Sequence, residues 1–178
     1  ACHMTTITKA RFSSNWGTTD GNWDLTNNDL TLDAWGSVSW KYNEDATTND
    51  PTACFDGTIK TVGAGLTEIN TPAGTHASDA GANLFIGASS AAATFVFDGY
   101  ISYFTAWKGY TMSDVRMQAM SRGVHPFFVS ETKPSIFIPN WGDDSPEFDL
   151  SGNNNDGTLT GTAKINAGPP VELLENYL

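Results

Sequence analysis

The chain has 178 residues and a formal net charge of -11 at pH 7, from 9 basic and 20 acidic side chains. Such a charge repels a phosphate backbone, so the composition disfavours nucleic-acid binding. The length suits a single domain, and aromatic residues, at 12%, together with 17 glycines favour an all-β fold with a filled core and many turns.

The first residues, Ala1-Cys2-His3-Met4, are typical of a cloning remnant before a start methionine, so residues 1–3 are left out of the functional interpretation. Cys54 is then the one native thiol, and the strand pattern around it predicts a buried hydrophobe rather than a nucleophile. The sequence has no apolar run of membrane-spanning length and no basic-then-apolar leader. We therefore expect no membrane span, no signal peptide and no membrane partner.

Short strand patterns separated by turn-rich intervals run through most of the chain. Their spacing predicts an antiparallel sandwich or jelly roll. The interval 63–83 is long for a loop and predicts an additional edge strand, and Asp156-Gly157 predicts a hairpin turn. The other predicted strands cover residues 5–12, 22–25, 30–32, 38–42, 52–62, 84–86, 93–107, 127–130, 136–140 and 157–165.

One short helix is predicted near the middle of the chain. Thr111 or Ser113 can serve as its N-cap, and Gly123 can end it. The side chains expected to pack it against the sheet are Val115, Met117 and Met120.

Three segments then follow one another in an order known from a protein family: the long strand pattern 97–107, Thr111-Met112-Ser113-Asp114-Val115, and Arg122-Gly123-Val124-His125-Pro126. In this order they resemble concanavalin A-like, laminin-G-type jelly rolls. Further similar segments are 40–43 and 49–57, which match the central strands of that family, and 139–142, 145–152 and 157–161, which resemble versions found in bacteriophage structural proteins.

The resemblance implies an antiparallel jelly-roll β-sandwich with one short helix, spanning residues 4–167 as a single domain, followed by a tail at 168–178. Members of the family usually begin with several more strands, so the chain resembles an N-terminally truncated member. Because missing strands leave edges and apolar faces uncovered, we expect a homo-oligomer in which another copy completes the sheet.

By resemblance, the function is that of a binding or assembly module for a glycan or a neighbouring virion protein, located on a virion, or in the cytoplasm on expression. Sugar sites combine aromatic rings with loop carboxylates, and in this family they sometimes use calcium. The nearest local match is the set Trp107, Trp141, Asp143, Asp144 and Asn140. Core packing is the competing interpretation of Trp107, which follows strand periodicity.

A metal-dependent hydrolase acting on esters or phosphoesters is the alternative function. Its zinc or manganese ligands would be His76, Asp79 and His125. These residues match no recognised ligand spacing, so a complete site would require a subunit interface.

Two other acidic patterns have structural interpretations. Glu147-Phe148-Asp149 lacks the second glutamate that a retaining glycosidase of this fold would need. An oxygen-rich cluster of Asp149, Asn153, Asn155 and Asp156 fits a calcium site, but Asx turns explain the same residues and are favoured.

Overall fold

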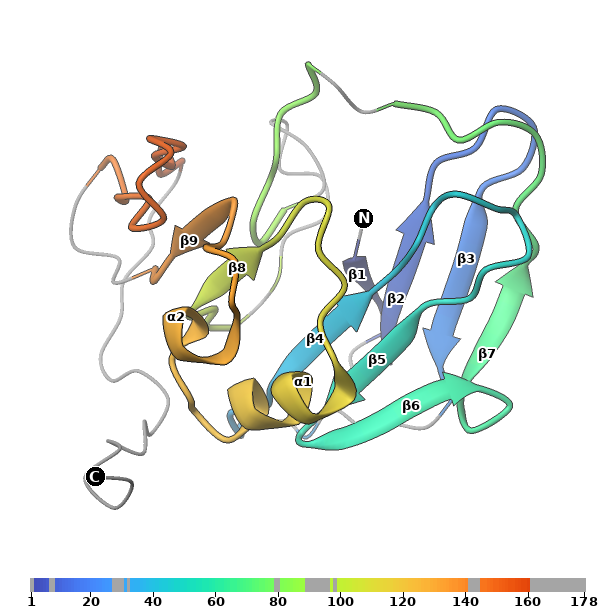
Figure 1. Cartoon of the computed structure of the whole chain (residues 1–178), viewed down its shortest axis with the longest axis horizontal. Coiled ribbons are helices and arrows are strands. Elements are labelled where there is room, and N and C mark those ends of the chain that lie inside the picture. The colour runs from blue at the N-terminus through green and yellow to red at the C-terminus, as the bar shows by residue number, and fades with distance from the viewer. Residues whose placement is uncertain are drawn as a thin grey trace. The chain divides into compact units, whose positions relative to one another are not determined.

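The computed structural model describes residues 2–6, 9–26, 31, 33–78, 81–88, 97, 99–140 and 145–160. Contacts within the chain define two compact units. Unit 1 comprises Ala1–Leu84 with Thr111–Ser121, and unit 2 comprises Phe85–Tyr110 with Arg122–Leu178. Most of the regular structure is β-strand, which confirms the all-β class (Figure 1). The jelly-roll arrangement and the single domain over 4–167 stay predictions.

Unit 1 is built on one seven-stranded sheet, in the order β1-β2-β3-β7-β6-β5-β4. Neighbouring strands are antiparallel except β6 and β7, which pair in parallel through Thr61 with Gly65 and Val62 with Leu66. The strands are β1 Cys2–Thr6, β2 Lys9–Ser14, β3 Gly21–Leu25, β4 Val38–Lys41, β5 Thr52–Phe55, β6 Thr58–Val62 and β7 Gly65–Asn70.

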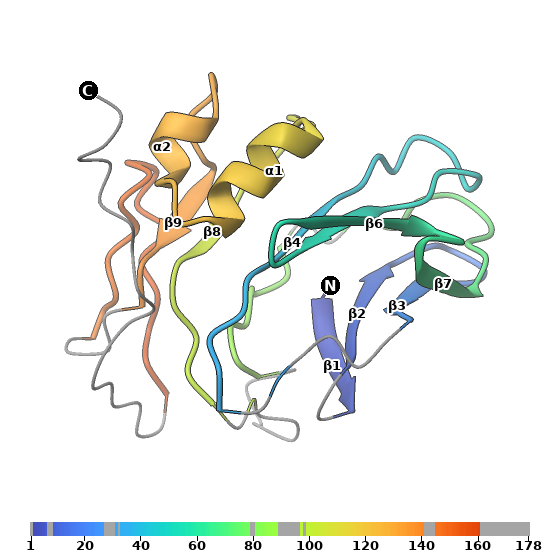
Figure 2. The same cartoon turned by 90° about the horizontal axis from the view of Figure 1, so that it is seen from below.

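This sheet folds over so that its two halves face each other. The Phe12 ring of β2 stacks on the Trp40 ring of β4 with centroids 5.6 Å apart, although these strands are not neighbours in the sheet. Figure 2 shows β4 and β6 lying across from β1, β2 and β3. Apolar residues at alternating positions therefore meet in one core, made of Ala10, Leu25, Ala53, Phe55 and Leu66 with Trp40 packed against them.

Three strand predictions in unit 1 need correction. The predicted strand 52–62 is a hairpin of β5 and β6, because Asp56 and Gly57 both have positive φ, 44° and 78°, as a two-residue hairpin turn requires. The predicted strand 5–12 is likewise divided between β1 and β2. The edge strand predicted in 63–83 exists as β7, but it lies inside the sheet between β3 and β6.

The predicted helix is confirmed as α1, Asp114–Ser121. It packs on unit 1 through the buried side chain of Met117, and Gln118 Nε2 donates to the carbonyl of Gly57 at 2.9 Å. Lys41 Nζ of β4 also pairs with Asp114 Oδ1 at 2.5 Å. Val115 was expected to pack as well, but its side chain is 73% exposed because it lies on the opposite side of the helix.

Unit 2 contains a two-stranded antiparallel sheet of β8, Phe104–Ala106, and β9, Ile136–Ile138. Among the described residues of the strand predicted over 93–107, only Phe104–Ala106 form a strand, and β8 begins directly after Tyr103, whose φ is positive at 56°. Residues 93–96 and 98 lie outside the described residues. Asn140, with a positive φ of 54°, follows the end of β9.

A second helix, α2 at Pro126–Val129, stands where a strand was predicted over 127–130. Proline is well suited to the first turn of a helix, and His125 caps this turn, so the local sequence favours a helix over a strand. The expectation of one helix was therefore wrong. None of the helices in the described ranges is both long and apolar enough to cross a membrane.

The remaining predicted strands are absent or lie outside the described residues. Residues 84–86 and 158–160 form no strand, while residues 30, 32 and 161–165 and the predicted tail at 168–178 lie outside the described ranges. Of the residues interpreted as a cloning remnant, Cys2 and His3 form part of β1.

Candidate functional site

Of the predicted glycan-binding residues, the structure describes Trp107 and Asn140, which belong to unit 2. Trp141, Asp143 and Asp144 lie outside the described residues. Trp107 is half-buried, and its indole Nε1 donates to the carbonyl of Thr132 at 3.0 Å, which fixes the ring against the segment before β9. Its part in ligand binding stays a prediction.

The two histidines predicted as metal ligands lie in different units. In unit 1, His76 Nε2 is 3.2 Å from Glu44 Oε2, and the His76 ring meets Trp16 edge to face at 5.3 Å. His125 belongs to unit 2, and Asp79 lies outside the described residues. Among the residues the structure describes, no three His, Cys, Asp or Glu side chains are grouped to hold a metal ion.

His125 is the N-cap of α2. Its Nδ1 accepts the backbone N–H of Phe127 at 3.4 Å, and its ring packs edge to face on Phe137 at 5.0 Å. Burial lowers the pKa of His125 below its ordinary 6.5, so the neutral form that can accept this hydrogen bond is favoured.

An aromatic cluster at one end of the unit 1 sheet was missed in the sequence. Trp23 is fully buried and its Nε1 donates to Asp50 Oδ1 at 2.8 Å. Burial raises the pKa of the Tyr42 phenol, although the neighbouring Trp16 and Ser14 side chains oppose part of that rise. Within the described residues, Tyr42 OH and the Nε1 atoms of Trp16 and Trp40 have no hydrogen-bond partner.

The signal for this cluster was present as two aromatic residues two apart, Trp40 on β4 and Tyr42 directly after its end. Because residues two apart in extended chain share one face, the fold brings both against Phe12 of β2, at 5.6 and 5.3 Å. The cluster fills the inside of the folded sheet, and we assign it to packing.

The acidic loop of unit 2 is organised by the buried carboxylate of Asp149. Its Oδ1 accepts the backbone N–H groups of Phe137 and Ser151, both at 2.9 Å. Its Oδ2 accepts the Ser151 hydroxyl at 2.8 Å and the Asn155 backbone N–H at 3.0 Å. Burial alone would raise the pKa of Asp149, but these hydrogen bonds together lower it to about 2. The bond from Ser151 N–H is an Asx turn, in agreement with the favoured interpretation.

The predicted Asp156-Gly157 hairpin turn is wrong. Asp156 Oδ1 accepts the backbone N–H of Asp149 at 2.8 Å, and Gly157 forms a single β-bridge with Glu147. The side chain of Asp156 is therefore used inside the loop, and the chain reverses over the longer segment between Glu147 and Gly157.

Large apolar side chains are exposed in unit 2 on two segments that contact Phe137 of β9. In the first segment, Phe127 packs edge to face on the Phe137 ring at 5.6 Å, and the next residue, Phe128, is 75% exposed. In the second segment, the backbone N–H of Leu150 donates to the Phe137 carbonyl at 2.8 Å. We name Phe127, Phe128, Phe148 and Leu150 the unit 2 apolar surface.

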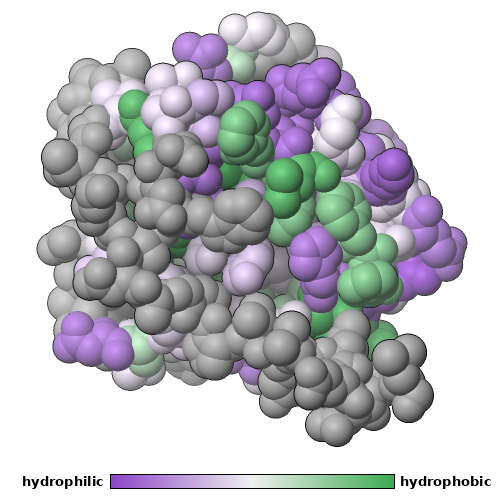
Figure 3. All heavy atoms as spheres, turned by 90° about the vertical axis from the view of Figure 1, so that its left-hand side faces the viewer, coloured by the Kyte–Doolittle hydropathy of each residue, from purple (hydrophilic) through white to green (hydrophobic). Residues whose placement is uncertain are grey.

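Figure 3 faces the side where α2 and β9 lie in Figure 1, and it shows hydrophobic side chains gathered in a band between hydrophilic ones. Exposed apolar patches of this kind, bordered by polar residues, mark interaction sites in soluble proteins.

Cys54 has no features of a nucleophile. It is buried, its Sγ lies 3.9 Å from Ser121 Oγ, and burial raises the pKa of its thiol, which keeps it protonated at neutral pH.

Comparison of the chain with protein-family models, curated proteins and solved structures finds no match. The resemblance to concanavalin A-like domains rests on the sequence motifs and stays a prediction.

Proposed function

We propose that this chain is a binding and assembly module, of the kind that resembles the concanavalin A-like domains of phage structural proteins, and that it associates through the unit 2 apolar surface. The observation that carries the proposal is Phe128, a large aromatic side chain that is 75% exposed on a short, fixed helix. Exposed aromatic residues in such settings are the anchors that contribute most of the binding energy at interfaces.

The helix that presents Phe128 is fixed before any partner arrives. Pro126 and Val129 are buried on its inner side, and the His125 cap orders its first turn. The ring of Phe127 packs edge to face on the ring of Phe137, which partly fixes its position. A partner that covers Phe128 therefore gains apolar contact without having to order the backbone beneath it.

The partner proposed is a second copy of the chain. The self-complementary contact of a two-fold dimer would bring the same apolar surface of each copy together. This agrees with the homo-oligomer expected from the resemblance to a truncated family member.

The test is the Phe128→Ser variant, measured by size-exclusion chromatography with light scattering across a concentration series. We expect the wild type to associate at micromolar concentration and the variant to associate at least about tenfold more weakly, as loss of an interface anchor predicts. Val115→Ser is the matched control, because Val115 is equally exposed, at 73%, but lies on α1 of unit 1. A wild-type monomer at these concentrations would rule out the second copy as partner.

Glycan binding and metal-dependent hydrolysis remain alternative proposals with separate tests. Calcium-dependent retention on a glycan array, lost in Trp141→Ala, would support the first. Stoichiometric zinc or manganese, with ester hydrolysis that is lost on chelation and in His76→Ala or His125→Ala, would support the second.

A further inference from the structure

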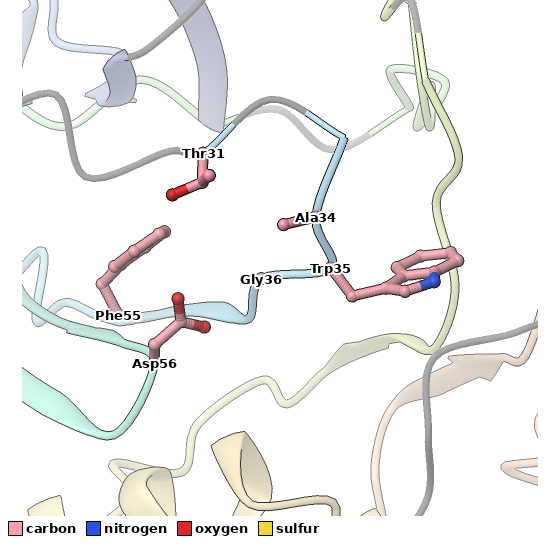
Figure 4. A pocket seen from close by; sticks show the side chains of 6 residues that line it. All are labelled: Thr31, Ala34, Trp35, Gly36, Phe55 and Asp56. Atoms are coloured by element: carbon pink, nitrogen blue, oxygen red, sulfur yellow. The ribbon is translucent and has the colours of Figure 1, made fainter.

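A small hollow lies in unit 1 between the segment before β4 and the turn that joins β5 to β6. It measures about 100 Å³. In Figure 4 the ring of Phe55 and the carboxylate of Asp56 point into this space, while the indole of Trp35 turns away from it. The residues that line it are Thr31, Ala34, Trp35, Gly36, Phe55 and Asp56.

The hydrogen bonds of Asp56 leave one of its oxygens for a ligand. Oδ1 accepts the backbone N–H of Ser37 at 2.7 Å and contacts the Ser37 hydroxyl at 3.4 Å. Among the described residues no lysine or arginine pairs with Asp56, and Oδ2 accepts no hydrogen bond. The negatively charged Oδ2 of Asp56 therefore faces the hollow next to the ring of Phe55.

The size of the hollow decides between ligand classes. A volume of about 100 Å³ equals roughly three water molecules. It is well below the roughly 300–1,000 Å³ of pockets that enclose drug-sized ligands. The hollow therefore accepts the end of a flexible group, such as an ammonium on a methylene stem, rather than a complete ring system.

The charge and the geometry further favour an ammonium. The charge of the Asp56 carboxylate attracts a cation, and the tip of the Phe55 ring beside it offers apolar contact to the methylenes that carry the cation. A guanidinium binds best with two parallel bonds to both carboxylate oxygens, but Oδ1 of Asp56 is already engaged by Ser37. An ammonium is a point charge and needs only Oδ2. The chain's net charge of -11 also attracts cations over a longer range.

We propose that this hollow binds a primary ammonium group, with Asp56 Oδ2 as its acceptor and the Phe55 ring and Ala34 against its methylenes. A lysine side chain of a partner protein and a free alkylamine both carry a primary ammonium group on methylenes, so either could be the ligand. The proposal concerns unit 1 and does not depend on the association of unit 2.

The test is an NMR titration of the whole chain that follows the backbone amides of Gly36, Asp56 and Gly57. The probes are n-butylammonium, the peptide acetyl-Gly-Lys-Gly-amide and its norleucine analogue, which lacks the ammonium. We expect both cations to shift these amides and the norleucine peptide to leave them unchanged. Shifts with n-butylammonium alone would assign the site to small amines.

Asp56→Asn is the decisive variant, because asparagine keeps an acceptor for Ser37 and suits the positive φ of this turn. We expect it to weaken ammonium binding about two- to fivefold, because Asp56 is exposed and an exposed ion pair contributes little free energy. Asp45→Asn, an exposed aspartate in the 43–50 loop, makes the same charge change and should leave binding unaffected.

A second variant fills the hollow. A Cβ at Gly36 would lie 3.5 Å from Asp56 Oδ2 and 3.6 Å from Phe55 Cζ, an ordinary contact, so Gly36→Ala should fold and still obstruct the ammonium. Undiminished binding in both Asp56→Asn and Gly36→Ala, equal shifts with the norleucine peptide, or no shift with either cation would overturn the proposal.

Discussion

At the scale of single residues, one buried carboxylate organises the loop that follows β9. Asp149 accepts hydrogen bonds from Phe137, Ser151 and Asn155, which lie on both sides of it in the sequence. A buried acceptor that satisfies several donors at once is costly to replace, because each donor then loses its partner away from water.

Asp149→Asn should therefore lower the free energy of unfolding by about 3 kcal/mol. The amide keeps one oxygen and places an NH2 group against donors that the second carboxylate oxygen accepted. Urea unfolding followed by tryptophan fluorescence measures this change. Asp156→Asn is the control, because it retains a side-chain oxygen for the Asp149 N–H and should cost clearly less.

Lowering the pH should also decrease the free energy of unfolding of the wild-type chain, because it protonates Asp149. The pKa of Asp149 is about 2 in the folded state against an ordinary 3.8, so the unfolded state binds the proton more readily. Ionised Asp149 therefore contributes about 2 kcal/mol to the free energy of unfolding. This contribution is complete above pH 4 and is lost as the pH falls from about 4 to about 2. Urea midpoints at pH 5 and pH 2.5 should differ less in Asp149→Asn than in the wild type. An equal acid dependence in both proteins would contradict this assignment.

At the scale of elements, α2 depends on the neutral form of His125. The protonated Nδ1 cannot accept the Phe127 N–H, and burial already holds the pKa below 6.5. The unfolded state therefore takes up the proton first, so stability is full above about pH 6.5 and falls as the pH drops below that value. His125→Ala should cost about 1 kcal/mol at pH 7.5, the usual loss for a missing cap.

His125→Asn separates the cap from the titration, because an asparagine oxygen can accept the same hydrogen bond at any pH. We expect near wild-type stability at pH 7.5 and a weaker dependence on pH between 7.5 and 5. The urea unfolding midpoints of the wild type, His125→Ala and His125→Asn, measured at pH 7.5 and pH 5, test this prediction.

The strands that could be predicted from sequence are those where local pattern and packing agree. β3 and β4 alternate apolar and polar residues, β9 is a short apolar run, and the predicted positions of all three are correct to within two residues. The hairpin at Asp56-Gly57 carries its own turn signal, although the strand pattern around it predicts one long strand over 52–62. Pro126 likewise indicated a helix start that was missed.

Other errors had no local cause. Nothing around Tyr103 marks a residue with positive φ, since tyrosine rarely adopts that conformation, and only the surrounding structure imposes it. The central place of β7 depends on pairing with β3, more than 40 residues earlier in the chain. The separation of His76 from His125 into two units is also a matter of tertiary contacts, which residue spacing does not report.

At the scale of the whole molecule, net charge should govern association. Two copies that each carry -11 repel one another, and salt screens that repulsion more strongly than it weakens apolar contact. We expect self-association to become several-fold tighter between about 0.05 M and about 0.5 M sodium chloride. Sedimentation velocity at the two salt concentrations measures this change in self-association. Weaker self-association at the higher salt concentration would indicate that ion pairs, and not the unit 2 apolar surface, hold the copies together.

The chain passes between its two units three times, after residues 84, 110 and 121. α1 belongs to unit 1, yet in the gene it is flanked on both sides by segments of unit 2. Neither unit can therefore be obtained by shortening the reading frame from one end. Recombination at any single junction would therefore divide at least one of the two units.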